Sequence, residues 1–146
     1  MRKIRIRDNV FHIAVAVFDK DGLLFDSRSF WRGLAQARAN AALRYMEEDI
    51  VQEWLKVMDV YGKVDKAGNF LVEEVKPDGV TAVASPHEEQ MITAAFLLQR
   101  LHCDWPVARE TAGKIFKEGD RDIDLKNAIV PKPGFPDIFC RLRAAG

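Results

Sequence analysis

The sequence is poor in the residues that build covalent or metal frameworks. It has two cysteines, Cys103 and Cys140, and no CxxC pair. Disulfide-bridged secreted scaffolds are denser in cysteine, so the pattern favours reduced thiols, although one bridge between the two stays open. The three histidines, His12, His87 and His102, are too scattered for a zinc site. We therefore expect neither a zinc centre nor a disulfide scaffold.

Long apolar runs and net charge are also missing. No stretch approaches the roughly 18 consecutive apolar residues of a membrane-spanning helix. The basic N-terminus is interrupted by Arg5, Arg7 and Asp8, which does not fit a signal peptide. Lys and Arg number 22, as do Asp and Glu, so no charge excess points to nucleic acid or to an anionic membrane. We expect a cytoplasmic protein without either partner.

What is present suits one globular domain: 146 residues, 48% hydrophobic and 30% charged. Residues 12–18, HIAVAVF, form a short apolar run rich in β-branched side chains, which predicts a strand buried on both faces, as in a parallel sheet. The run stops at Asp19, and Gly22 follows as a turn residue.

Most of the remaining chain has helical periodicity. Ser85 and Asp104 are placed to cap two of the helices, and Trp31, Trp54 and Trp105 fall on apolar faces that we expect in the core. The expected elements are two helices between residues 30 and 61, the second ending at Gly62, a hairpin within 63–72, a loop at 76–86, and helices over 85–102, 104–118 and 135–145. A strand that is apolar on both faces needs neighbouring strands, and this pattern offers only a weak hairpin.

The stretch AVFDKDGLLFDS, residues 16–27, allows three interpretations. A calcium loop starting at Asp19 would need an oxygen ligand at position 5 and glutamate at position 12, where Leu23 and Phe30 stand. A plain turn, with Asp26 or Ser27 capping the next helix, leaves two further aspartates unexplained. The third interpretation is a reaction centre, because ligands bind at the carboxyl ends of strands in open parallel sheets.

The chemistry of such a centre is specific. Asp19 can attack a phosphoryl group and form an aspartyl-phosphate, while Asp21, on the same side of an extended chain, serves as general acid and base. Mg²⁺ is needed to hold the anionic phosphate against an anionic nucleophile. Gly22 would let backbone N–H groups approach the phosphate oxygens.

These residues resemble the first motif of the haloacid dehalogenase-like (HAD) hydrolases. Residues 15–27, VAVFDKDGLLFDS, match its apolar strand, DxDG and DS, with Leu23 in place of the usual Thr. Residues 131–146, PKPGFPDIFCRLRAAG, are similar to the segment that leads into the family's second motif. The helical stretch between them is similar to the cap that one subgroup inserts there. The resemblance covers the whole chain.

The resemblance implies an α/β fold with a Rossmann-like core in the parent protein. It divides the chain into a first core strand with its catalytic turn (1–29), a helical cap (30–130) and a linker with a returning core helix (131–146). It implies that Asp19 is the nucleophile, that Asp21 is the acid and base, and that both hold Mg²⁺. The implied substrate is a small phosphorylated metabolite, and Asp21 favours phosphatase over dehalogenase chemistry. Arg28 and Arg32 could face the substrate phosphate or lie on a solvated helix face.

The family's second, third and fourth motifs cannot be placed. They would supply a Ser or Thr, a Lys and an acidic pair. We therefore expect a truncated, mostly helical part of a HAD hydrolase that is inactive alone and that self-associates through its unpaired apolar strand. The alternative is a non-catalytic helical interaction module that keeps a relic of the motif.

Overall fold

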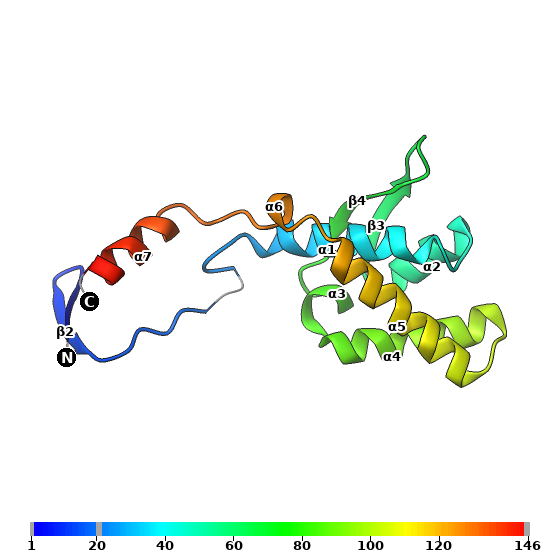
Figure 1. The fold of residues 1–146 in the computed structure, drawn as a ribbon, viewed down its shortest axis with the longest axis horizontal. Coiled ribbons are helices and arrows are strands. Elements are labelled where there is room, and N and C mark those ends of the chain that lie inside the picture. The colour runs from blue at the N-terminus through cyan, green and yellow to red at the C-terminus, as the bar shows by residue number, and fades with distance from the viewer. Residues whose placement is uncertain (1, 20–21, 145–146) are drawn as a thin grey trace. The chain divides into compact units, whose positions relative to one another are not determined.

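The computed structural model describes residues 2–19 and 22–144 and divides the chain into two compact units (Figure 1). Residues Arg28–Ile129 form the helical unit. Residues 1–27 and 130–146 form the flanking unit, built from chain on both sides of the first. The fold is mixed α/β, with helices and two small antiparallel sheets in the described residues.

The helical unit alternates helices with one β-hairpin. Its hairpin pairs β3 with β4 in antiparallel register, with a bulge between Tyr61 and Gly62. Its elements are α1 (Ser27–Ala42), α2 (Glu48–Val57), β3 (Val60–Val64), β4 (Phe70–Val75), α3 (Val80–Val83), α4 (Pro86–Leu101), α5 (Trp105–Asp122) and α6 (Leu125–Ala128).

Two predicted helix starts are confirmed by their caps. The Ser85 hydroxyl accepts from the Glu88 amide while the Glu88 carboxylate accepts from the Ser85 amide, which is a capping box at the start of α4. The Asp104 carboxylate accepts from the Val107 amide at 3.0 Å and begins α5. In both helices, proline follows the cap within two residues, where its missing N–H costs nothing.

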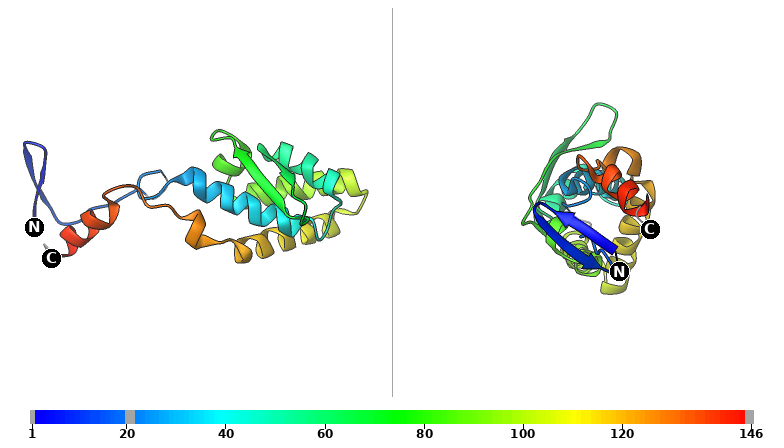
Figure 2. Two further views of the ribbon diagram at one scale, coloured as in Figure 1. Left: turned by 90° about the horizontal axis from the view of Figure 1, so that it is seen from above. Right: turned by 90° about the vertical axis from the view of Figure 1, so that its left-hand side faces the viewer.

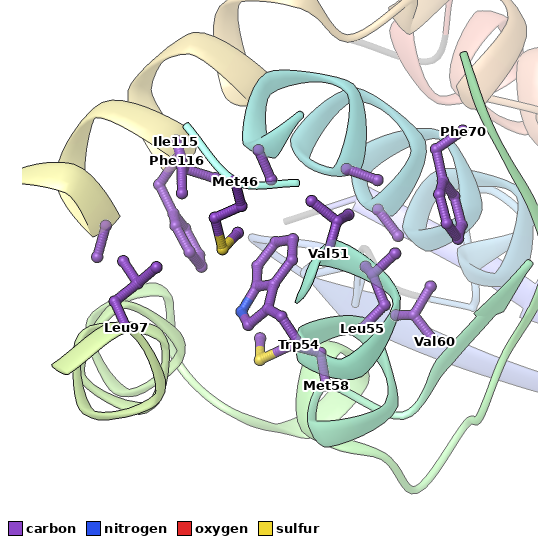
Figure 3. Close-up of a cluster of buried hydrophobic side chains, with 14 of the residues drawn as sticks. Met46, Val51, Trp54, Leu55, Met58, Val60, Phe70, Leu97, Ile115 and Phe116 are labelled. Atoms are coloured by element: carbon purple, nitrogen blue, oxygen red, sulfur yellow. The ribbon is translucent and has the colours of Figure 1, made fainter. Parts of the chain in front are cut away.

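The core of the helical unit is centred on Trp54 (Figure 3). Trp54 is 1% exposed, and its indole N–H donates to the hydroxyl of Thr93 at 3.0 Å, so the one polar atom of the ring is satisfied. Leu97 and Phe116 bring α4 and α5 into the same cluster. The expectation for Trp105 is wrong: it is 41% exposed, because it stands in the first turn of α5, beyond the packed face.

Polar side chains of α1 bind the backbone of β4, and the hairpin lies alongside this helix (Figure 2). The Val72 amide donates to Gln36 Oε1 at 2.8 Å, and the Phe70 amide donates to Asn40 Oδ1 at 2.7 Å. The guanidinium of Arg32 donates to the main-chain carbonyl of Glu73. The three side chains are four residues apart, so they share one face of the helix and take the place of a third strand.

Removing one of these acceptors tests the α1–β4 contact. Gln36→Ala is expected to lower the free energy of unfolding by about 1–3 kcal/mol, because the amide of the buried Val72 loses its partner. Gln36→Glu keeps an acceptor oxygen and should cost less. Gln99→Ala, on the exposed part of α4, is the control. Urea unfolding followed by circular dichroism measures all three, and equal stabilities for the two alanine variants would contradict the assignment.

The flanking unit does not contain the predicted buried strand over residues 12–18. Instead β1 (Arg2–Ile6) and β2 (Asn9–Ile13) form an antiparallel hairpin, and residues 14–19 follow it without regular secondary structure. Val17 is 90% exposed, so this part of the prediction is wrong. The physical reason is that no described strand lies beside the segment to complete a ladder.

The predicted end of the second helix is also wrong. α2 ends at Val57, the chain reverses through Asp59 with φ at 57°, and Gly62 lies inside β3. The last predicted helix is confirmed as α7 (Phe135–Ala144). Among residues 2–19 and 22–144, no helix combines the length and hydrophobicity needed to cross a membrane.

Candidate functional site

The candidate nucleophile Asp19 is exposed at the end of the segment that follows β2. Its predicted partner Asp21 lies outside the described residues. Gly22 comes next with φ at +76°, a left-handed conformation that favours glycine and turns the chain directly after the aspartates. In the described residues, the exposed Asp19 carboxylate thus comes shortly before a glycine turn, where a ligand from solvent can reach it.

The segment after the turn is fixed by backbone pairing with a distant part of the chain. The Asp26 amide donates to the Val130 carbonyl at 2.8 Å, and the Lys132 amide donates to the Leu24 carbonyl at 3.0 Å. Between them Phe25 and Pro131 form an antiparallel bridge, and Phe25 is 8% exposed. The two connections between the flanking unit and the helical unit are therefore adjacent.

The segment before Asp19 contacts the last helix. The ring of Phe18 lies 5.1 Å from that of Phe139 on α7, and Phe139 meets Phe135 edge-on at 4.7 Å between centroids. These ring contacts hold the residue next to Asp19 against α7. They are the described side-chain contacts that anchor the candidate site.

The two arginines after the motif have different surroundings. Arg32 belongs to the helical unit, where its guanidinium binds the carbonyl of Glu73. Arg28 is exposed at the start of α1. Arg32 thus has a structural role in the helical unit.

A metal ion at this segment could bind the exposed Asp19 carboxylate. The Asp19 carboxylate is of the kind that Mg²⁺ prefers, and Mg²⁺ commonly binds proteins through one or two carboxylates while water and phosphate fill the other positions. The donor chemistry therefore fits Mg²⁺. Within the part of the chain that the structure describes, no group of three or more His, Cys, Asp or Glu side chains is placed to hold a metal ion.

A second charged centre lies inside the helical unit and was not predicted. Arg38 on α1 donates to both carboxylate oxygens of Glu89 on α4, at 2.9 and 3.1 Å, and to Asp120 on α5 at 2.8 Å. Its guanidinium lies 4.2 Å from the centre of the Phe116 ring. Arg38 and Glu89 are 5% and 3% exposed. The partners are 51 and 82 residues away, so no local signal in the sequence could reveal them.

This centre is built for packing. α5 approaches α1 so closely at Gly119 that a Cβ there would lie 2.7 Å from the Arg38 Cα. Burial raises the pKa of Glu89, and the charge of Arg38 opposes that shift. Both carboxylates accept hydrogen bonds from Arg38, so the centre joins three helices rather than presenting a reactive group.

No protein-family model, curated protein or solved structure matches this chain.

Proposed function

We propose that Asp19 is the nucleophile of a HAD-like, Mg²⁺-dependent hydrolase that acts on small phosphomonoesters. In this proposal, residues 1–29 carry the first strand and catalytic turn of a Rossmann-like core, residues 30–130 are the cap, and residues 131–146 lead back into the core. In this proposal, residues 1–146 do not supply the remaining phosphate- and metal-binding groups, so we expect these residues alone to be inactive.

The observation that carries the proposal is the bridge between Phe25 and Pro131. It brings together the two points where the helical unit is inserted, directly after the motif. A module that is inserted between two adjacent points can vary in sequence without disturbing the flanking segments that hold the catalytic residues. This topology supports the interpretation of the helical unit as a cap placed after a nucleophile motif.

The proposed reaction uses two carboxyl groups. A carboxylate oxygen of Asp19 attacks phosphorus, and the bond from phosphorus to the alkoxy oxygen breaks as Asp21 protonates that oxygen. Asp21 then takes a proton from water, which attacks the phosphoryl group and releases Asp19 and inorganic phosphate. When bound by the Asp19 carboxylate and the Asp21 carbonyl, Mg²⁺ supplies the positive charge that lets two anions approach.

A second candidate function is a non-catalytic interaction module. The observation in its favour is that the helical unit has a core of its own, whose buried residues all lie between Ala35 and Phe116. Such a unit does not need the flanking segments to bury its apolar surface. In that case Asp19 would have no role in any activity.

A phosphatase assay separates the two functions. We expect residues 1–146 to show no turnover of an aryl phosphate with Mg²⁺, and the protein from the full reading frame that contains them to hydrolyse it. Asp19→Asn should lower that activity by at least about 10³-fold, because the amide is not a nucleophile. Asp137→Asn, an exposed aspartate on α7, is the matched control. Undiminished turnover in Asp19→Asn would refute the nucleophile, and an inactive full-length protein would favour the interaction module.

A further inference from the structure

Residues 14–18, AVAVF, form an apolar segment between β2 and Asp19, in which residues 14–17 are exposed and Phe18 is partly buried against Phe139. Val15 and Val17 are 74% and 90% exposed, although valine is usually buried. The segment has no charge, no proline and no glycine. No ladder joins it to another described strand. A short β-prone segment with open backbone groups is a template for strand addition.

The order of large and small residues in the segment is self-complementary. In an extended chain, alternate side chains point to opposite faces, so Ala14, Ala16 and Phe18 share one face. Val15 and Val17 share the other. If two copies run antiparallel about Ala16, Val15 meets the partner copy's Val17, and Ala14 meets the partner copy's Phe18. The first is a favourable β-branched pair, and the second sets a small side chain against a large one.

We propose that residues 14–18 of two copies of this chain pair as antiparallel strands about a two-fold axis at Ala16. The negative charge of Asp19, next to the segment, favours antiparallel over parallel pairing. A parallel, in-register pair would place Asp19 beside Asp19, and like charges directly opposite are destabilising. In the antiparallel pair Asp19 lies opposite Ile13 instead. The two-fold axis closes the assembly at a dimer. The pairing is proposed for residues 1–146 on their own, because in the proposed hydrolase the same segment would pair with the other strands of the core.

Disulfide trapping tests the register. In a Cys103→Ser/Cys140→Ser background, Ala16→Cys places two thiols opposite each other on the axis. Facing residues in an antiparallel pair have Cα atoms about 4.5–5.5 Å apart, within the range of about 4.4–6.8 Å that a disulfide bridges. Val15→Cys places the thiols on a longer diagonal. Val83→Cys, 69% exposed in the helical unit, reports random collision.

We expect Ala16→Cys to form several-fold more covalent dimer under mild oxidation than Val15→Cys, and Val83→Cys to form least. Equal trapping at residues 15 and 16 would indicate parallel strands and overturn the proposal, as would trapping at residue 16 no higher than at residue 83. Light scattering on the uncrosslinked protein gives a second measurement. The wild-type chain should be a dimer at micromolar concentration and Val15→Asp a monomer with unchanged circular dichroism. A wild-type monomer, or a Val15→Asp dimer, would also overturn the proposal.

Discussion

Arg38→Met is expected to destabilise the helical unit by about 3–5 kcal/mol, because it leaves the carboxylate of Glu89 buried without a partner. Asp120 is half exposed and can return to water, so most of the cost belongs to Glu89. Arg44→Met is the matched control. Arg44 also joins two carboxylates, but it is 52% exposed, and water screens exposed ion pairs so that they contribute little to stability.

The pH dependence of the stability of Arg38→Met shows whether the unpaired Glu89 carboxylate causes the destabilisation. Burial already raises the pKa of Glu89, and removing Arg38 takes away the charge that opposes the shift. A carboxyl group with a raised pKa in the folded state binds more protons when folded than when unfolded. Stability is therefore retained at acidic pH and lost as pH rises above the ordinary glutamate pKa of about 4.3. Urea unfolding of the variant between pH 4 and 8 measures this slope.

A double variant distinguishes an unpaired charge from poor packing. Arg38→Met/Glu89→Leu replaces the buried pair with apolar side chains and should recover most of the lost stability, because such replacements are often neutral or stabilising. If the double variant is as unstable as Arg38→Met and shows no pH slope, the loss comes from helix packing and the electrostatic explanation is wrong.

Trp54→Ala is the second large effect, with an expected loss of about 3–5 kcal/mol. The side chain is 1% exposed at the centre of the core and its removal leaves a cavity between α2, α4 and α5 (Figure 3). Because small domains have total stabilities of about 5–15 kcal/mol, this variant should be close to unfolding at room temperature. Thermal melting followed by circular dichroism measures the effect.

Two variants calibrate the Trp54 result. Trp105→Ala removes the same side chain from a site that is 41% exposed and should cost less than about 1 kcal/mol. Trp54→Phe retains most of the packing but leaves the Thr93 hydroxyl without its indole partner, at a cost of about 1–3 kcal/mol. Equal losses for Trp54→Ala and Trp105→Ala would contradict the position of the core.

The helical part of the fold was largely predictable, because its signals are local. Ser85 with Pro86 and Asp104 with Pro106 mark helix starts through contacts within three residues. The hairpin was predicted from the turn residues between Val64 and Phe70. Helix caps and turns depend on neighbouring residues only, so one sequence is enough to place them.

The strands could not be placed in the same way. Residues 12–18 have the composition of a buried strand, but a strand needs partners that composition does not provide. The alternation of charged and apolar residues in Lys3–Ile6, followed by Asp8 and Asn9, was the signal for the β1–β2 hairpin and was missed. The α2 end was misplaced because the apolar residues that start β3 continue the helical pattern.

The candidate site was predicted only where its residues are adjacent in sequence. Asp19 and Gly22 follow from DxDG, and the positive φ of Gly22 agrees with the turn expected there. The bridge between Phe25 and Pro131 joins residues more than a hundred positions apart, and the Arg38 centre joins three helices. Such contacts depend on tertiary packing, which no short pattern encodes.

The central claim is that Asp19 carries the phosphoryl group. The direct measurement is mass spectrometry of the full-length protein after turnover of an aryl phosphate with Mg²⁺ and a quench in acid, which preserves acyl phosphates. We expect one added phosphoryl group on the peptide that contains Asp19, and none in Asp19→Asn. A phosphoryl group on another residue, or turnover that never labels the protein, would contradict the account.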